Sequence, residues 1–257
     1  MIAKMILTSK NNPLIKETAS LKEKKGRKTL GAFLVEGKKM SRECIASDFG
    51  IERVFLSESF DEKDASWLLP LADKTTFVSD DAFKALSDEK TPQGILCRVK
   101  IPETELRPPQ GKCLLLDGVA DPGNMGAIIR TANAAGYDEI YLTSECTDPY
   151  APKSVRASMS GLFFTKLYVA SRAEILNVLN GFPVFVADMG GANIFQVNPP
   201  KAYAIVIGNE ANGVSDECKA AATQTICIPM RETQESLNAA VSAGIAMYVL
   251  AKDEFQN

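Results

Sequence analysis

Hydrophobic and polar positions along this chain form two alternating patterns. Short apolar runs, rich in β-branched and aromatic residues and bounded by Gly, Pro or polar residues, predict β-strands. Segments in which apolar residues recur every three or four positions separate most of these runs and predict helices. The predicted strands cover residues 32–37, 51–57, 75–79 and 94–100 in the first part of the chain, and 112–117, 139–143, 165–170, 183–188, 203–208 and 225–230 in the second.

The predicted helices start at recognisable caps. Asn12 followed by Pro13 is typical of an N-cap and the first helical position, and we expect a second cap at Ser79 or Asp80. Further helices are predicted through Met40 and Ile45, over residues 125–135, from about residue 152, near residues 173–179, and from an N-cap at Ser236, where the apolar face would hold Leu237, Ala240, Val241, Gly244, Ile245 and Tyr248.

Strands and helices alternate in both parts of the chain, which predicts two α/β domains. The strands of the second part are so apolar that we expect a parallel sheet covered by helices on both faces. Between the two parts, residues 101–111 hold three prolines in eleven residues and show no apolar periodicity, so they predict a linker. The predicted domains are therefore residues 1–100 and residues 112–257.

Composition narrows the possible chemistry. The 257 residues include no histidine, which removes the most common general base and the most common transition-metal ligand. The six cysteines form no C-x-x-C pair, so we expect neither a zinc site nor a disulfide framework. No apolar run reaches the roughly 18 residues of a membrane helix, and the first residues become polar too early for a secretory signal. We therefore expect a cytoplasmic protein.

The net charge of −3 hides an uneven distribution of charges. Residues 1–42 contain eleven Lys or Arg and three Glu, so this segment carries a net charge of +8 while the remainder of the chain carries −11. A basic segment on an acidic body indicates a polyanionic partner, although a solvated helix face would show the same charges.

The candidate site lies in the loops that follow three strands of the second part, because open α/β sheets bind ligands at the carboxyl ends of their strands. The first two of these loops are rich in glycine. Neither has the G-x-G-x-x-G spacing of a dinucleotide site, and neither ends in the lysine of a P-loop, which argues against a nucleoside triphosphate site. These glycines are Gly118, Gly123 and Gly126 in the first loop, and Gly208 and Gly213 in the second.

Helical spacing separates core residues from candidate functional residues after the first loop. Four apolar residues share one face of the predicted helix and are expected in the core, whereas Arg130 points away from that face. The residues alone leave open whether Arg130 is a solvated surface arginine and whether Asn124 is only an N-cap. The apolar face consists of Ile128, Ile129, Ala132 and Ala135.

Three stretches of the second part occur in a distinctive order: PGNMGAIIRTANAAG, AIVIGNEANGVS and ICIPMRETQESLNAAVSAGIAMY. Together they closely resemble the three motifs of the SpoU (TrmH) family of RNA ribose 2′-O-methyltransferases, and the resemblance covers residues 112–250. The segment DPYAPKSVRASMSGLFF resembles the family's connection between the first two motifs. The first part, with FLVEGKKM, is similar to the family's substrate-binding domain, which resembles ribosomal kink-turn-binding proteins.

The resemblance implies a fold and a set of site residues. It implies an α/β fold whose C-terminal parallel sheet contains a trefoil-knotted region that binds S-adenosylmethionine (AdoMet), a smaller N-terminal α/β substrate-binding domain, and a homodimer that completes the site. General topology rules would not predict such a knot. The positions that match the family's AdoMet contacts are Gly208, Asn209, Ile228, Pro229 and Leu237, and those that match its active site are Asn124, Arg130, Glu210, Ser236 and Asn238.

The resulting prediction is an AdoMet-dependent RNA 2′-O-methyltransferase that uses no metal and acts on ribosomal RNA in preference to transfer RNA. The alternative is a non-catalytic RNA-binding or ribosome-assembly factor with the same fold. The intact set of active-site residues argues against that alternative, because a protein that only binds RNA has no evident use for it. The side chains expected to contact the RNA backbone are Lys10, Lys16, Lys38, Lys153 and Arg156.

Overall fold

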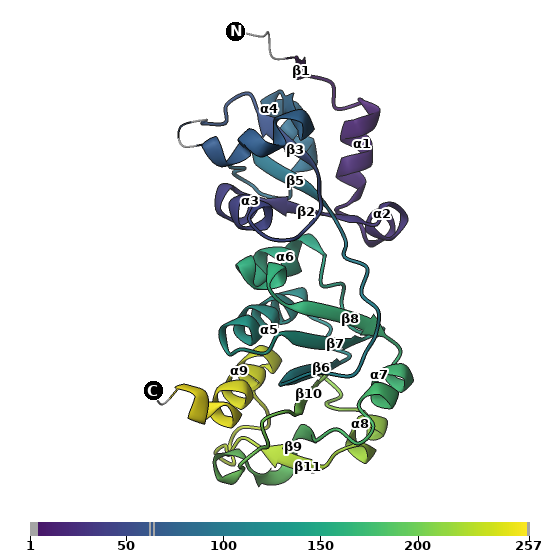
Figure 1. The fold of residues 1–257 in the computed structure, drawn as a ribbon, viewed down its shortest axis with the longest axis vertical. Coiled ribbons are helices and arrows are strands. Elements are labelled where there is room, and N and C mark those ends of the chain that lie inside the picture. The colour runs from purple at the N-terminus through teal and green to yellow at the C-terminus, as the bar shows by residue number, and fades with distance from the viewer. Residues whose placement is uncertain (1–4, 62, 64, 256–257) are drawn as a thin grey trace. The chain divides into compact units, whose positions relative to one another are not determined.

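The computed structural model describes residues 5–61, 63 and 65–255. The chain divides into two compact units, which we describe separately (Figure 1). The first unit comprises Met1–Glu103 and Tyr150–Arg156, and the second comprises Thr104–Pro149 and Ala157–Asn257.

The N-terminal unit is built on a mixed five-stranded sheet with the strand order β1-β4-β3-β5-β2. Strand β3 pairs in parallel with β4 and antiparallel with β5. The strands are β1 (Ile6–Leu7), β2 (Ala32–Glu36), β3 (Ile51–Ser57), β4 (Thr75–Val78) and β5 (Ile95–Lys100). The helices are α1 (Pro13–Ser20), α2 (Lys24–Leu30), α3 (Lys38–Ile45), α4 (Asp80–Leu86) and the 3₁₀-helix η1 (Ser66–Lys74).

The predicted caps of this unit are confirmed. Asn12 Oδ1 accepts a hydrogen bond from the Leu14 N–H at 2.9 Å, with Pro13 at the first helical position. Ser79, rather than Asp80, caps α4 by accepting from the Ala82 N–H. Helix α2 and strand β1 are not predicted from the sequence, because α2 is mostly basic and β1 is too short to show a period.

The second unit is a six-stranded sheet with the order β11-β9-β10-β6-β7-β8, in which every described pair of neighbouring strands is parallel. The predicted fold class is thereby confirmed. The strands are β6 (Cys113–Asp117), β7 (Glu139–Thr143), β8 (Lys166–Ala170), β9 (Val184–Asn193), β10 (Ala204–Gly208) and β11 (Gln224–Cys227). The helices are α5 (Pro122–Ala134), α7 (Arg172–Val178), α8 (Asp216–Ala220), α9 (Ala239–Leu250), η2 (Met159–Phe163), η3 (Ile194–Gln196) and η4 (Lys252–Phe255), while α6 (Pro152–Ser158) spans the division between the units.

Helices cover both faces of this sheet, as the apolar strands predict. Cys113 and Leu115 of β6 point to one face, where they pack in a buried cluster with Ile175 of α7 and Cys218 of α8. Figure 1 shows α5 and α9 on the opposite face. Because alternate residues of β6 face opposite sides, a strand buried on both faces must be apolar at nearly every position.

Helix α5 begins earlier than the sequence predicts. Its N-cap is Asp121, whose side chain accepts from the Asn124 N–H at 2.9 Å, and Pro122 occupies the first helical turn. Asn124 therefore lies inside that turn, and the alternative in which it serves as the N-cap is wrong. Arg130 is exposed, and the predicted core face is fully buried, consisting of Ile128, Ile129, Ala132 and Ala135.

Helix α9 begins later than predicted and buries a different face. Its N-cap is Asn238, and Ser236 remains in the preceding loop, so the predicted cap is wrong. Val241 and Tyr248 of the predicted apolar face are 50% and 43% exposed. The helix is apolar around its whole circumference, so periodicity could not decide which face would be buried. The buried residues are Ala239, Ala243, Ala246, Met247 and Leu250.

Candidate active site

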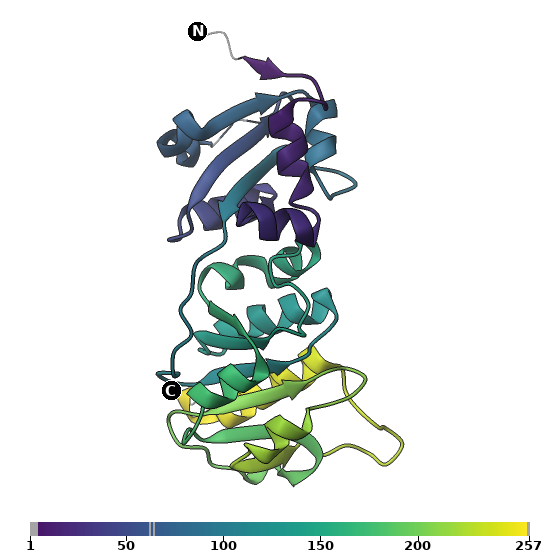
Figure 2. The same cartoon turned by 90° about the vertical axis from the view of Figure 1, so that its right-hand side faces the viewer.

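A cleft of about 570 Å³ opens beside the middle of β9 and the carboxyl ends of β10 and β11. Clefts of this size accommodate cofactors and other small molecules. Figure 2 shows the connection between β11 and α9, drawn in yellow-green, as an extended loop. Of the residues predicted for the site, Gly208, Asn209, Glu210, Ile228, Ser236, Leu237 and Asn238 line this cleft.

The loop after β10 is held in a closed turn by its own backbone. The N–H groups of Asn209 and Gly213 each donate to the other residue's carbonyl at 2.9 Å. The Asn209 side chain accepts from the N–H groups of Ala211 and Asn212, and its Nδ2 donates to the Gly118 carbonyl at 2.7 Å. This last bond ties the loop to the end of β6.

Gly208 is required by the close approach of the chain to itself. A Cβ atom at this position would lie 2.2 Å from the carbonyl carbon of Gly213, which is far inside van der Waals contact. The turn that carries Asn209 and Glu210 into the cleft can therefore close only on a glycine.

Glu210, Asn124 and Asn238 form a hydrogen-bonded chain across three segments of the protein. Glu210 Oε1 accepts from Asn124 Nδ2 at 2.9 Å, and Asn124 Oδ1 accepts from Asn238 Nδ2 at 2.9 Å. Glu210 also accepts from the N–H groups of Ala120 and Asp121, at 3.0 and 3.2 Å. Asn238 in turn caps α9, so each amide has a fixed orientation.

The environment of Glu210 keeps its carboxylate ionised. Burial acts to raise its pKa, but the hydrogen bonds from the Ala120 N–H and the Asn124 amide outweigh burial, and the pKa lies below the ordinary value. A carboxylate that is stabilised in this way is a poor general base. Its geometry suits it to hold the turn before α5 and the Asn124 amide in place.

Three predicted residues do not line the cleft within the described part of the chain: Asn124, Arg130 and Pro229. Asn124 is joined to the cleft through its hydrogen bonds to Glu210 and Asn238. Arg130 lies on the exposed surface of α5, and Pro229 is exposed in the loop after β11. Gly161 of η2 packs directly on the helix backbone at Arg130, where a Cβ would lie 2.9 Å from the Arg130 Cα. The guanidinium therefore projects from a well-packed part of the molecule but not into the cleft of its own chain.

Asp188 and Cys227 are among the residues that line the cleft and that sequence reasoning missed. The Asp188 carboxylate accepts from the Lys219 ammonium at 2.6 Å, and this bond lowers the pKa of Asp188 below its usual range. The sequence signal that could have identified Asp188 is its position as an acidic residue at the end of the apolar predicted strand 183–188. Cys227 is half-buried, whereas the other five cysteines are buried free thiols.

The second part of the chain matches the SpoU rRNA methylase family over residues 111–248. The chain belongs to this family. The first part matches the MRM3-like substrate-binding domain over residues 12–97. The predicted family and its methyltransferase activity are thereby confirmed.

Relatives of the whole chain support this assignment. The 23S rRNA (guanosine(2553)-2′-O)-methyltransferase RlmP of Bacillus subtilis is 30% identical over 247 residues, which cover 95% of this chain and 98% of the relative. The crystal structure of an AdoMet-bound rRNA methyltransferase from Sinorhizobium meliloti superposes with a TM-score of 0.88 at 25% identity, covering 98% of this chain and 99% of the other. A crystal structure described as an RNA 2′-O ribose methyltransferase gives a TM-score of 0.82 at 28% identity, covering 98% of this chain and all of the other.

The side chains that the sequence assigns to RNA lie in varied surroundings in this SpoU-family protein. Lys10, Lys16 and Lys153 are exposed. Lys38 is half-buried, and its ammonium donates to the Lys63 carbonyl at 3.3 Å. The structure places Arg156 differently from the surface role that the sequence suggests.

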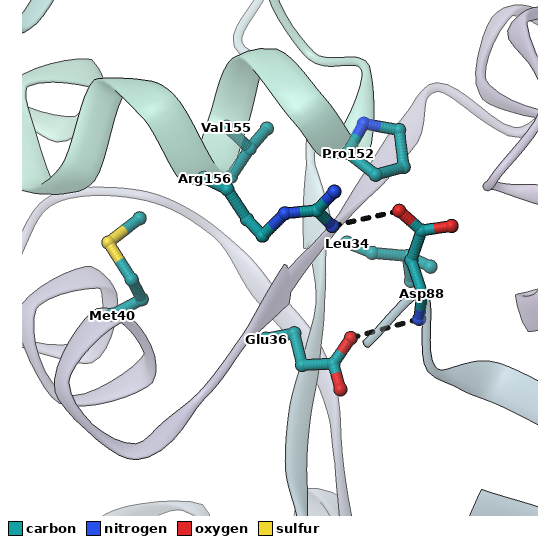
Figure 3. A pocket seen from close by; sticks show the side chains of 7 residues that line it. All are labelled: Leu34, Glu36, Met40, Asp88, Pro152, Val155 and Arg156. Carbon is teal, nitrogen blue, oxygen red and sulfur yellow. Dashed lines mark hydrogen bonds and ion pairs between the residues drawn. The ribbon is translucent and has the colours of Figure 1, made fainter. Parts of the chain in front are cut away.

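Arg156 is held by acidic residues of the N-terminal unit. Its guanidinium contacts the Asp88 carboxylate at 2.8 Å and the Glu89 carboxylate at 3.0 Å. Figure 3 shows Arg156 reaching Asp88, whose backbone N–H donates to Glu36. The cavity beside them measures about 20 Å³, which is room for roughly one water molecule and excludes a nucleotide.

Among the residues that the structure describes, no group of three or more Cys, Asp or Glu side chains is arranged to hold a metal ion. Over the same residues, every helix is too short or too polar to span a bilayer.

Proposed function

We propose that this protein transfers a methyl group from AdoMet to the 2′-hydroxyl of a ribose in ribosomal RNA, and specifically in the RNA of the large ribosomal subunit. The observation that carries the proposal is the Glu210–Asn124–Asn238 chain at the rim of a cofactor-sized cleft. Similarity to RlmP over nearly the full length of both chains supports ribosomal RNA over transfer RNA.

The cleft has the size and lining that AdoMet requires. Ile228 and Leu237 offer apolar surface to an adenine ring, and the turn at Gly208 and Asn209 presents backbone groups to the polar parts of the molecule. Pro229 would contribute through its backbone. When bound, AdoMet supplies an electrophilic methyl group, so positioning of the ribose oxygen provides much of the rate.

We assign the residues of the hydrogen-bonded chain to orientation. Glu210 holds the Nδ2 group of the Asn124 amide, and Asn238 holds its Oδ1 oxygen. Asn124 would then present its remaining N–H to the ribose or to its phosphate. Ser236, which is exposed at the cleft, would add a further hydrogen bond to the substrate.

Arg130 would bind a phosphate of the RNA through two parallel hydrogen bonds and would lower the free energy of the developing alkoxide. A guanidinium is a reluctant base because its pKa lies above about 12. We therefore propose that water or a phosphate oxygen accepts the proton of the ribose hydroxyl.

A homodimer would bring Arg130 to a cleft. Arg130 does not line the cleft of its own chain in the described residues. On α9, Val241 and Tyr248 are exposed, and Gly244, which lies between them in the sequence, faces Thr131, the residue after Arg130. A second copy of the chain would cover these apolar side chains and supply its own Arg130. In this arrangement each active site contains residues of both subunits.

Within this proposal, residues 1–100 bind the RNA, residues 101–111 link the domains and residues 112–257 carry the reaction. Lys10, Lys16, Lys38 and Lys153 would contact phosphates, and Arg156 would do so only if it left its acidic partners. We propose that a metal takes no part, since the sequence lacks histidine, the usual catalytic metal ligand. With bacterial ribosomal RNA as the substrate, the protein would act in the cytoplasm.

Transfer of labelled methyl from AdoMet to unmodified RNA tests the reaction. The substrates are in vitro transcripts of bacterial 23S rRNA, 16S rRNA and a tRNA pool, and the proteins are wild type and Asn124→Ala. We expect a 2′-O-methyl nucleoside from 23S rRNA with wild type, and its loss in the variant. Methylation of tRNA alone would refute the assigned RNA, and methylation of a base would refute the assigned position.

Mixing two inactive variants tests the shared active site. Arg130→Ala and Glu210→Gln are each expected to have low activity alone. In a mixed dimer, one site combines an intact cleft from one chain with an intact Arg130 from the other, so activity should return. Failure to recover activity in mixed dimers that are shown to form would place Arg130 in the cleft of its own chain.

A further inference from the structure

Asp117 is a buried carboxylate at the end of β6 that the proposed reaction does not use. Its side chain is almost fully buried, at 2% exposed, although Asp117 is the last residue of β6 and the loop that leads to α5 follows it directly. A buried ionised group needs compensating partners, and its presence in an otherwise apolar strand calls for a physical reason.

The two carboxylate oxygens of Asp117 contact different segments. Oδ2 accepts from the Ser215 N–H at 2.8 Å, and Oδ1 accepts from the Arg172 guanidinium at 2.9 Å. Ser215 is the N-cap of α8 and ends the loop that begins at Gly208. Arg172 is the first residue of α7 and lies 3.9–4.0 Å from the more exposed carboxylates of Glu145 and Glu217.

The loop between Gly208 and Ser215 is therefore fastened at both ends to adjacent residues of one strand end. Asn209 donates to the carbonyl of Gly118 at the start of the loop, and Ser215 donates to the carboxylate of Asp117 at its end. Between these two anchors lies Glu210, which binds the backbone of Ala120 and Asp121.

We propose that Asp117 is a positioning residue for AdoMet, and that Arg172 supports it. The carboxylate holds the end of the cofactor loop through the Ser215 N–H, so that the loop is already in its binding conformation before AdoMet enters. This inference rests on the proposed use of the cleft for AdoMet. Arg172 compensates the buried charge, and its position at the start of α7 links a third segment to the same strand end.

Burial raises the pKa of Asp117, but the bonds from Ser215 and Arg172 outweigh it, so the pKa is lowered and the group is an anion at neutral pH. Asparagine at this position keeps the shape of the side chain. It can keep one acceptor for the Ser215 N–H only by turning its NH₂ group toward the Arg172 guanidinium, where two donors would face each other. The substitution thus removes an anchor with little change in volume.

The test compares Asp117→Asn with wild type, and Asp138→Asn serves as the matched control because Asp138 is an exposed carboxylate of the same unit. Hydrogen exchange of the amides of residues 209–215 is measured without cofactor, and AdoMet affinity is measured by calorimetry. For Asp117→Asn we expect exchange in this loop to quicken and the Kd for AdoMet to rise about tenfold, with kcat at saturating AdoMet within about twofold of wild type. The control should match wild type in all three.

Arg172→Gln is the second variant, in case Asp117→Asn does not fold. It is expected to raise the Kd in the same direction, and Arg172→Lys should restore part of the affinity because it keeps the positive charge. Unchanged loop exchange and unchanged Kd in a folded variant would overturn the inference. So would faster exchange spread evenly over the whole unit, since that pattern indicates a purely structural ion pair. If wild type itself failed to bind AdoMet, the proposed function would be refuted, and the exchange experiment would still decide whether Asp117 orders the loop.

Discussion

Replacement of Glu210 by Gln tests whether this carboxylate orients the active site or transfers a proton. The substitution keeps the length of the side chain and removes its charge. In the structure, Oε1 accepts from the Asp121 N–H and from Asn124 Nδ2, and Oε2 accepts from the Ala120 N–H. Glutamine offers one oxygen and one NH₂ group, so at least one of these donors would face another donor.

The expected loss of transition-state stabilisation follows from the number of hydrogen bonds that the substitution weakens or removes. With the amide oxygen in the place of Oε1, the bond from the Ala120 N–H is lost and the other two bonds lose the help of the charge. A hydrogen bond to a charged group contributes about 1.5–3 kcal/mol, and the exposure of Glu210 reduces this figure. We therefore expect a loss of about 2 kcal/mol in transition-state stabilisation, which corresponds to roughly a 30-fold fall in kcat/KM.

The assay is transfer of labelled methyl from AdoMet to an unmodified 23S rRNA transcript, with AdoMet affinity measured separately. Glu105→Gln is the control, because Glu105 is an exposed glutamate of the same unit and should tolerate the change. A kcat/KM for Glu210→Gln within about twofold of wild type would refute the orienting role. A fall of more than about a thousandfold, with AdoMet affinity unchanged, would instead indicate proton transfer by Glu210.

Three other outcomes are expected. Gly208→Ala should weaken AdoMet binding at least tenfold because its Cβ would meet the carbonyl carbon of Gly213 at 2.2 Å. Gly111→Ala should bind AdoMet normally, because a Cβ at Gly111 would have no atom within 4 Å, and equal calorimetric affinities of the two variants would contradict the prediction. Saturating AdoMet should slow alkylation of Cys227 by iodoacetamide, as followed by peptide mass spectrometry, and equal rates would place the cofactor outside this cleft. The pKa of Asp117 is lower in the folded state than in the unfolded state, so the stabilisation it provides is present above the unfolded value of about 3.9 and is lost as the pH falls through the folded value. The difference in Tm between wild type and Asp117→Asn should therefore be constant from about pH 5 to 8 and shrink below about pH 4. A Tm difference that changes near neutral pH would be inconsistent with this prediction.

Much of the second unit was predictable from its strands. Residues 113–117 and 204–208 are apolar at nearly every position, and this pattern alone predicted a parallel sheet covered on both faces. The same strands end in glycine-rich loops, so the rule for open sheets predicts a site near Gly208, which is where the cleft lies. Such predictions succeed because they rest on local patterns that the sequence carries directly.

The errors lie where two local patterns compete. Ser236 and Asn238 are both good caps, and the contact between Asn238 and Asn124 favours the later start of α9. Ser236 instead stays in the loop, where its carbonyl accepts from the Gln234 side chain. The boundary of a helix with two adequate caps is thus decided by distant contacts.

The sequence predicts the alternation of strands and helices, the parallel sheet and, through resemblance to a family, most of the candidate residues that line the cleft. Only the folded structure shows which face of α9 is buried, which amide hydrogen-bonds to Glu210, and that Asp117 fastens the loop between Gly208 and Ser215. The physical reason is the separation along the sequence over which each interaction acts. Hydrophobic periodicity and capping act between residues a few positions apart, whereas Asp117 and Ser215 meet only because parallel strands bring their carboxyl ends to one edge of the sheet.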